Sequence, residues 1–163
     1  MPQPPILVRL YPDEHVTVGP TTGTEMITNA RLLFTGYLDP YFKYWGTNVP
    51  SAPTSPREVA IYEVHEDADF QTMFGTLSAP EVLCLEQGEI LDFVRKYRSK
   101  LHPEGWATFF LFKVKGEVLV TSVRVYDYGT KLTVHIKRFN DVHVYPGLYR
   151  YRVVVLLAGV VNP

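Results

Sequence analysis

Cysteine is nearly absent from this sequence, and long apolar runs are missing altogether. The 163 residues include a single cysteine, Cys84, which excludes a small scaffold held together by disulfides. Cys84 lies in the apolar run Val-Leu-Cys-Leu, a setting typical of a small buried side chain and not of an activated nucleophile. No stretch approaches the roughly 18 uninterrupted apolar residues that cross a bilayer, so we expect no membrane partner.

Sequence motifs that carry chemistry are also lacking. We find no Gly-x-Ser-x-Gly elbow, phosphate loop, dinucleotide fingerprint, His-Glu-x-x-His or Cys-x-x-Cys. The first residues, Met-Pro-Gln-Pro-Pro, lack the basic and apolar regions of a secretory signal. These absences favour a protein that is not an enzyme, needs no cofactor and lies in the cytoplasm or in a virion.

The composition is otherwise that of a folded domain, but its prolines are unevenly spread. Apolar residues make up 46% of the chain and charged residues 20%, close to the average for soluble domains. Nine of the 13 prolines lie in the first 57 residues. We therefore predict a proline-rich extended arm with short strands over residues 1–57 and a core domain over residues 58–163.

The core domain has the pattern of an α+β fold. Apolar residues spaced three and four apart predict one main helix over residues 88–101. Three segments rich in β-branched and aromatic residues predict an antiparallel β-meander packed against that helix, with strands over 106–114, 117–126 and 131–139.

Two predicted turns define the register of this meander. Two-residue turns at Lys115-Gly116 and Tyr128-Gly129 place apolar side chains of all three strands on one face, pairing Phe112 with Leu119 and Val123 with Val134. A last strand is expected within residues 148–160, buried on both faces near its end. Residues 25–38 fit either a helix or a strand.

Charge is segregated along the chain. Residues 1–57 are neutral, residues 58–101 carry a net charge of −5, and residues 102–163 carry +4. Such asymmetry can steer partners or align copies in an assembly, and it can equally reflect pairing between the two segments within one fold.

Aromatic residues form the first candidate site, which is an interface. Its residues are Tyr37, Tyr41, Phe42, Tyr44, Trp45, Tyr149 and Tyr151, and aromatic side chains commonly anchor protein contacts. Packing into the core is the other interpretation. Together with the arm and the segregated charge, the aromatic residues favour a structural assembly protein, such as a component of a phage virion. It would act through protein–protein contacts in a homo-oligomer, by exchange of arms and strands between subunits.

Two alternative functions rest on other residues. A basic sheet face would bind nucleic acid through Lys113, Arg124, Lys131, Lys137 and Arg138. A small metal-dependent hydrolase would instead use the acidic cluster of His65, Glu66, Asp67 and Asp69.

Overall fold

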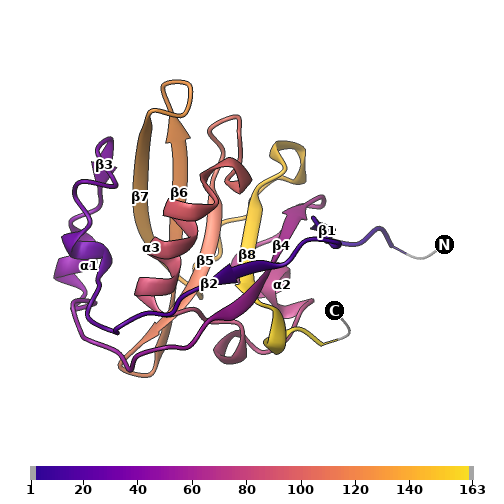
Figure 1. The fold of residues 1–163 in the computed structure, drawn as a ribbon. Coiled ribbons are helices and arrows are strands. Elements are labelled where there is room, and N and C mark those ends of the chain that lie inside the picture. The colour runs from indigo at the N-terminus through magenta and orange to yellow at the C-terminus, as the bar shows by residue number, and fades with distance from the viewer. Residues whose placement is uncertain (1–2, 162–163) are drawn as a thin grey trace.

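A single mixed β-sheet organises the molecule (Figure 1). The computed structural model describes residues 3–161. Its eight strands are β1 (Leu7–Leu10), β2 (Val16–Val18), β3 (Tyr37–Leu38), β4 (Arg57–Val64), β5 (Thr108–Val114), β6 (Glu117–Tyr126), β7 (Lys131–Arg138) and β8 (Arg152–Leu156). They lie in the order β1-β4-β8-β5-β6-β7-β3, and β2 also pairs with β4.

The helices are short apart from one. They are α1 (Tyr41–Tyr44), α2 (Phe70–Gly75), α3 (Gln87–Lys96) and the 3-10 helices η1 (Ile27–Asn29), η2 (Pro80–Val82), η3 (Arg98–Lys100), η4 (Gly147–Tyr149) and η5 (Leu157–Gly159). Among the described residues, no helix is long and apolar enough to cross a membrane.

The predicted antiparallel meander is wrong as a description of the sheet. Strand β8 runs parallel to β5, and β3 runs parallel to β7, so the sheet is mixed. The last segment does not continue the meander at its edge; it returns to the centre of the sheet and inserts between β4 and β5. This placement buries Val153, Val154 and Val155 completely, as expected for a continuous apolar strand.

Within β5, β6 and β7 the predicted register is confirmed. Phe112 faces Leu119 and Val123 faces Val134. Lys115 and Gly116 both have positive φ, 52° and 80°, which is the backbone of a tight hairpin turn whose twist matches the strands.

The predicted extended arm is also corrected. Strands β1 and β2 pair with β4, and β3 pairs with β7, so the proline-rich segment adds strands to both ends of the sheet. Its apolar residues Val18, Ile27 and Phe42 are buried in the same core as the helix, which explains why it does not remain extended. Residues 25–38 form neither a regular helix nor a long strand: they contain η1, a turn over 31–33 and the two residues of β3, joined by irregular backbone.

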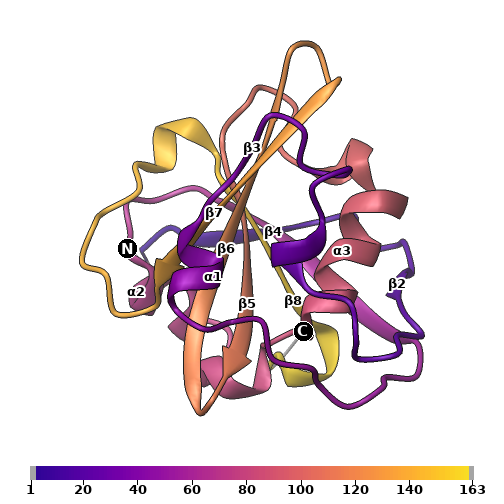
Figure 2. The same ribbon diagram turned by 90° about the vertical axis from the view of Figure 1, so that its left-hand side faces the viewer.

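The sheet is covered on both faces (Figure 2). On one face α3 packs through Ile90, Phe93 and Val94 against apolar side chains of β4 to β8. On the other face α2 packs through Phe70, Met73 and Phe74. The predicted helix over 88–101 is present as α3 followed by η3, and a reciprocal capping box of Glu86 and Glu89 starts it.

Candidate docking groove

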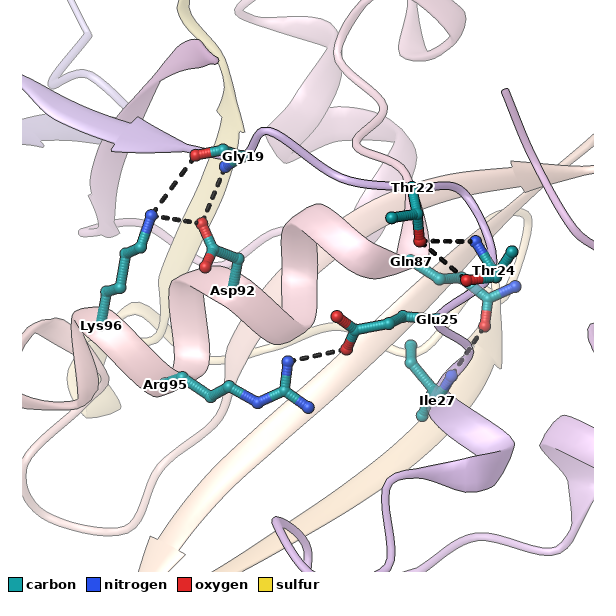
Figure 3. Close-up of polar contacts among 9 residues, drawn as sticks. All are labelled: Gly19, Thr22, Thr24, Glu25, Ile27, Gln87, Asp92, Arg95 and Lys96. Atoms are coloured by element: carbon teal, nitrogen blue, oxygen red, sulfur yellow. Dashed lines mark hydrogen bonds and ion pairs between the residues drawn. The ribbon is translucent and has the colours of Figure 1, made fainter. Parts of the chain in front are cut away.

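Residues 26–48 form a lobe whose two ends are held together by one buried side chain, Gln87. The backbone N–H of Ile27 donates to Gln87 Oε1 at 3.0 Å, and Gln87 Nε2 donates to the carbonyl of Thr47 at 2.7 Å. Figure 3 shows Gln87 reaching Ile27 from the start of α3. One amide thus joins the two ends of the lobe to the main helix.

The far side of the lobe is fixed to β7. The N–H of Asp39 donates to the carbonyl of Val134 at 3.0 Å, and Asp39 Oδ2 accepts from the N–H of Ile136 at 3.2 Å. Asp39 Oδ1 accepts from the N–H of Tyr41 at the start of α1. Phe42 is fully buried and stacks on Phe112. The lobe is therefore a preformed surface, which lowers the entropic cost of binding.

The chain that leads into the lobe is held along α3 (Figure 3). The N–H of Gly19 donates to Asp92 Oδ2 at 2.7 Å, and Lys96 Nζ lies 2.8 Å from the same carboxylate oxygen. Arg95 forms an ion pair with Glu25 at 2.7 Å. These polar contacts, together with the buried apolar residues, attach the N-terminal segment to its own helix.

The outer side of the lobe contains a groove of about 1100 Å³. Its lining includes two bases, exposed apolar or aromatic side chains and an amide: Arg31, Leu32, Tyr37, Lys43, Tyr44 and Asn48. We call this surface the aromatic groove. Leu32 is 97% exposed and Tyr44 is 73% exposed. Over residues 3–161, neither Arg31 nor Lys43 is paired with a carboxylate, so the groove presents positive charge beside unburied apolar area.

The seven predicted interface residues lie in three environments. Tyr37, Tyr41 and Tyr44 are exposed on the lobe. Phe42 and Tyr151 belong to the core, so neither is available as a contact residue of the folded chain. Trp45 is half-buried beneath the Arg138 guanidinium, and Tyr149 stacks on Trp106 away from the lobe.

The five bases predicted for nucleic acid do not form one continuous face. Lys131 pairs with Asp127 and Arg138 pairs with Glu117. Arg138 lies over Trp45 on the α3 side of the sheet, whereas Arg124 lies on the opposite side, 5.9 Å from the Trp106 ring. Lys113 is exposed and Lys137 half-buried. At Lys131 and Arg138, phosphate contacts would therefore have to compete with the existing acidic partners.

The four predicted metal ligands hold local structure. His65 Nε2 lies 2.9 Å from Glu63 Oε1, and Asp67 Oδ1 accepts from the N–H of Gly147 at 2.9 Å. Asp69 caps α2 by accepting from the N–H of Thr72. Hydrogen bonds from the Thr72 side chain and then from its backbone lower the pKa of the Asp69 carboxyl. Glu66 is exposed. Within residues 3–161, no three His, Cys, Asp or Glu side chains are grouped to hold a metal ion.

Cys84 has the environment of a structural thiol. Its Sγ donates to the carbonyl of Pro80 at 3.3 Å. Burial, with a smaller contribution from Glu81, raises the pKa of the thiol to about 12, so the nucleophilic thiolate is scarce at neutral pH.

Three residues of the candidate groove and its support were not singled out from the sequence. Gln87 has binding partners 40 and 60 residues away, and no local pattern signals such contacts. Arg31 and Leu32 were part of a segment whose alternation suggested a strand, although turns expose both side chains.

Comparison with protein-family models, with curated proteins and with solved structures finds no match to this chain.

Proposed function

We propose that this protein is a non-enzymatic assembly protein that associates with further copies of itself through the aromatic groove. The observation that carries the proposal is the preformed lobe, which exposes Leu32, Tyr41 and Tyr44 although its base is fixed by Gln87, Asp39 and Phe42. Exposed aromatic and apolar side chains on a rigid support are typical of interface anchors.

The contact we propose uses side chains and not strand exchange. Strands β1, β2 and β3 already pair with strands of their own chain. Both ends of the sheet are closed by short strands near Pro5, Pro12 and Pro40, a common device against edge-to-edge pairing.

Nucleic acid is the competing occupant of the groove, because tyrosines beside bases can stack on bases and neutralise phosphates. Protein is favoured by Leu32, whose fully exposed aliphatic side chain offers nothing to a phosphate or a base edge.

The proposal is tested by measuring mass in solution over a wide range of protein concentration. We expect the wild type to self-associate and the double variant Leu32→Ser with Tyr44→Ser to be at least tenfold weaker, since both changes remove exposed apolar area. Tyr128→Ser is the matched control, because Tyr128 is an exposed tyrosine at the β6–β7 turn, outside the groove.

Three results would contradict the proposal. They are a monomer at every concentration, equal association of the double variant and the wild type, and a loss of association in the Tyr128 control. Tight binding of a single-stranded oligonucleotide that Leu32→Ser leaves unchanged would point to the nucleic-acid function instead.

A further inference from the structure

The charge segregation along the chain becomes a separation in space. Strands β4 and β7 lie near opposite ends of the sheet, β4 beside β1 and α2, and β7 beside β3 and α1 (Figure 1). Residues 3–15 and 57–75, at the β4 end, contain seven acids and two bases. Residues 26–48 and 113–138, at the β7 end, contain eight bases and three acids. The net charge is therefore −5 in the residues at the β4 end and +5 in those at the β7 end, equal in size and opposite in sign.

The two ends do not neutralise each other within the chain. In the described part of the molecule, acids of residues 58–92 form ion pairs with His15, Arg57, His65 and Lys96, and with no base beyond residue 101. Arg31 and Lys43 at the positive end, and Glu66, Asp67 and Asp69 at the negative end, take part in none of these ion pairs. They remain available for a contact between molecules, where complementary surfaces speed encounter and fix orientation.

The negative end also exposes apolar side chains beside its carboxylates. Ala68 and Tyr145 exchange two backbone hydrogen bonds, of 3.2 and 2.8 Å, and the N–H of Gly147 donates to Asp67. These contacts join the β7–β8 connection to the acidic segment, on the α2 side of the sheet (Figure 2). Val142 is 82% exposed and Leu148 is 81% exposed on this connection.

We call Glu66, Asp67, Asp69, Val142, Val144 and Leu148 the acidic patch. Residues 63–69 and 141–150, which contain it, hold five acids and one base, Arg150. The patch thus combines carboxylates with aliphatic side chains, whereas the aromatic groove combines Arg31 and Lys43 with Leu32 and tyrosines.

We infer that the occupant of the aromatic groove is the acidic patch of a second copy, so that copies join head to tail. This inference rests on the proposed function and names the surface that the groove binds. Because groove and patch lie at different ends of one chain, the contact is heterologous: each copy offers one free groove and one free patch, and assembly continues until a ring closes or a filament grows.

The test uses two variants, each lacking one surface. The groove variant carries Arg31→Ser, Lys43→Ser and Tyr44→Ser; the patch variant carries Glu66→Ser and Leu148→Ser. Asp69 is kept because it caps α2. Lys113→Ser and Glu81→Ser, at exposed positions outside both surfaces, serve as matched controls. Mass in solution is measured for each variant alone, for an equimolar mixture, and at low and high salt.

We expect each variant alone to remain monomeric and the mixture to form a dimer of one copy of each, because one intact groove meets one intact patch and no further site is left. Association should weaken at least tenfold in high salt, where charges are screened. Formation of the mixed dimer also shows that both variants are folded.

The outcomes separate this inference from the proposed function. If the groove variant is monomeric and the patch variant assembles like the wild type, the groove binds another groove, so the proposed function stands and the head-to-tail contact is overturned. If the wild type never associates, both are overturned. Two monomeric variants that fail to form a dimer when mixed also overturn the head-to-tail contact.

Discussion

The N-terminal segment, residues 3–56, and the three-stranded unit of β5, β6 and β7 belong to one sheet but are attached to it in different ways. The strands of the unit pair across short turns, with Val114 facing Glu117 and Tyr126 facing Lys131. The N-terminal segment pairs over long distances, since Val16 faces Val59 and Leu7 faces Val64. It also depends on polar side chains of α3.

The difference shows which part of the fold is encoded locally. Turn geometry and alternation are sufficient to predict the pairing of β5 to β7, whereas the N-terminal segment is positioned by contacts with β4 and α3 that are distant in the sequence. Pairing strands that are tens of residues apart costs more loop-closure entropy than closing a short hairpin. Changes in the contacts of α3 should therefore loosen the N-terminal segment before they affect the hairpins.

The largest effect is expected from Glu89→Ala. Glu89 is fully buried and accepts hydrogen bonds from Arg57 Nε at 2.8 Å, from Arg57 Nη2 and from the N–H of Glu86 at 2.9 Å. It thus joins the start of α3 to the start of β4. Removing the carboxylate leaves the N–H of Glu86 and the partly exposed guanidinium without their partner, at a cost of about 1–3 kcal/mol for the N–H and more for the charged group.

Urea unfolding measures this loss. Glu81→Ala, at an exposed acid of η2, is the control and should change the free energy of unfolding by about 0.5 kcal/mol or less. If Glu89→Ala lowers the free energy of unfolding by less than about 1 kcal/mol, water has replaced the carboxylate as the hydrogen-bond partner. A hydrogen bond that is exchanged for one with water changes stability by only about 1 kcal/mol.

A smaller and more local effect is expected from Gln87→Ala. The change leaves the buried N–H of Ile27 and the carbonyl of Thr47 without their partner, at a cost of about 1–3 kcal/mol for each orphaned group. Hydrogen exchange should become faster in residues 26–48 and stay unchanged in β5, β6 and β7. Gln71→Ala, at an exposed glutamine of α2, is the matched control. Equal acceleration in both regions would mean that Gln87 stabilises the whole fold and not the N-terminal segment alone.

The same contrast explains what the sequence could predict. Strands β5, β6 and β7 and the register between them followed from turns and alternation, and α3 followed from its apolar stripe. The parallel insertion of β8 did not follow, because a continuous apolar strand carries no information about its neighbours.

The candidate site was foreseen only in part. The aromatic run lies in the lobe, but burial divides it: Phe42 faces the core while Tyr41 and Tyr44 are exposed. A run of adjacent aromatics has no periodicity from which to separate these roles. The groove also needs Gln87, whose partners lie 40 and 60 residues away, and the contact of Asp39 with Ile136, 97 residues away. Such pairings are set by the tertiary fold alone.

Acid should lower the free energy of unfolding through His102, which lies shortly before β5. Its Nε2 donates to the carbonyl of Tyr149, and its Nδ1 accepts from the N–H of Glu104. Burial, followed by the positive charge of Arg152, lowers the pKa of His102 below its ordinary value of 6.5. As the pH falls below about 6.5, the unfolded chain takes up this proton before the folded protein does, so the free energy of unfolding decreases by up to about 1.4 kcal/mol per pH unit.

Thermal unfolding between pH 5 and pH 8 checks this prediction. His102→Gln removes the titrating group, so the difference in stability between wild type and variant should shrink as the pH falls from 6.5 and stay constant above it. His135, whose pKa is also lowered by burial, titrates in both proteins and cancels. A difference that does not vary with pH would mean that the His102 ring is already solvated in the folded protein.

The smallest effect is expected from the exposed ion pair of Arg95 with Glu25. Both side chains are about half exposed, so solvent screens the attraction and the pair should contribute about 0.2–1 kcal/mol. A double-mutant cycle with Arg95→Ala and Glu25→Ala isolates that energy from the other contacts of each residue. The coupling should disappear in 1 M salt.

A coupling above about 1.5 kcal/mol that persists in salt would mean that this part of the N-terminal segment is held by its exposed charges. A small coupling would leave Gln87 and the buried apolar residues as the groups that join the segment to α3.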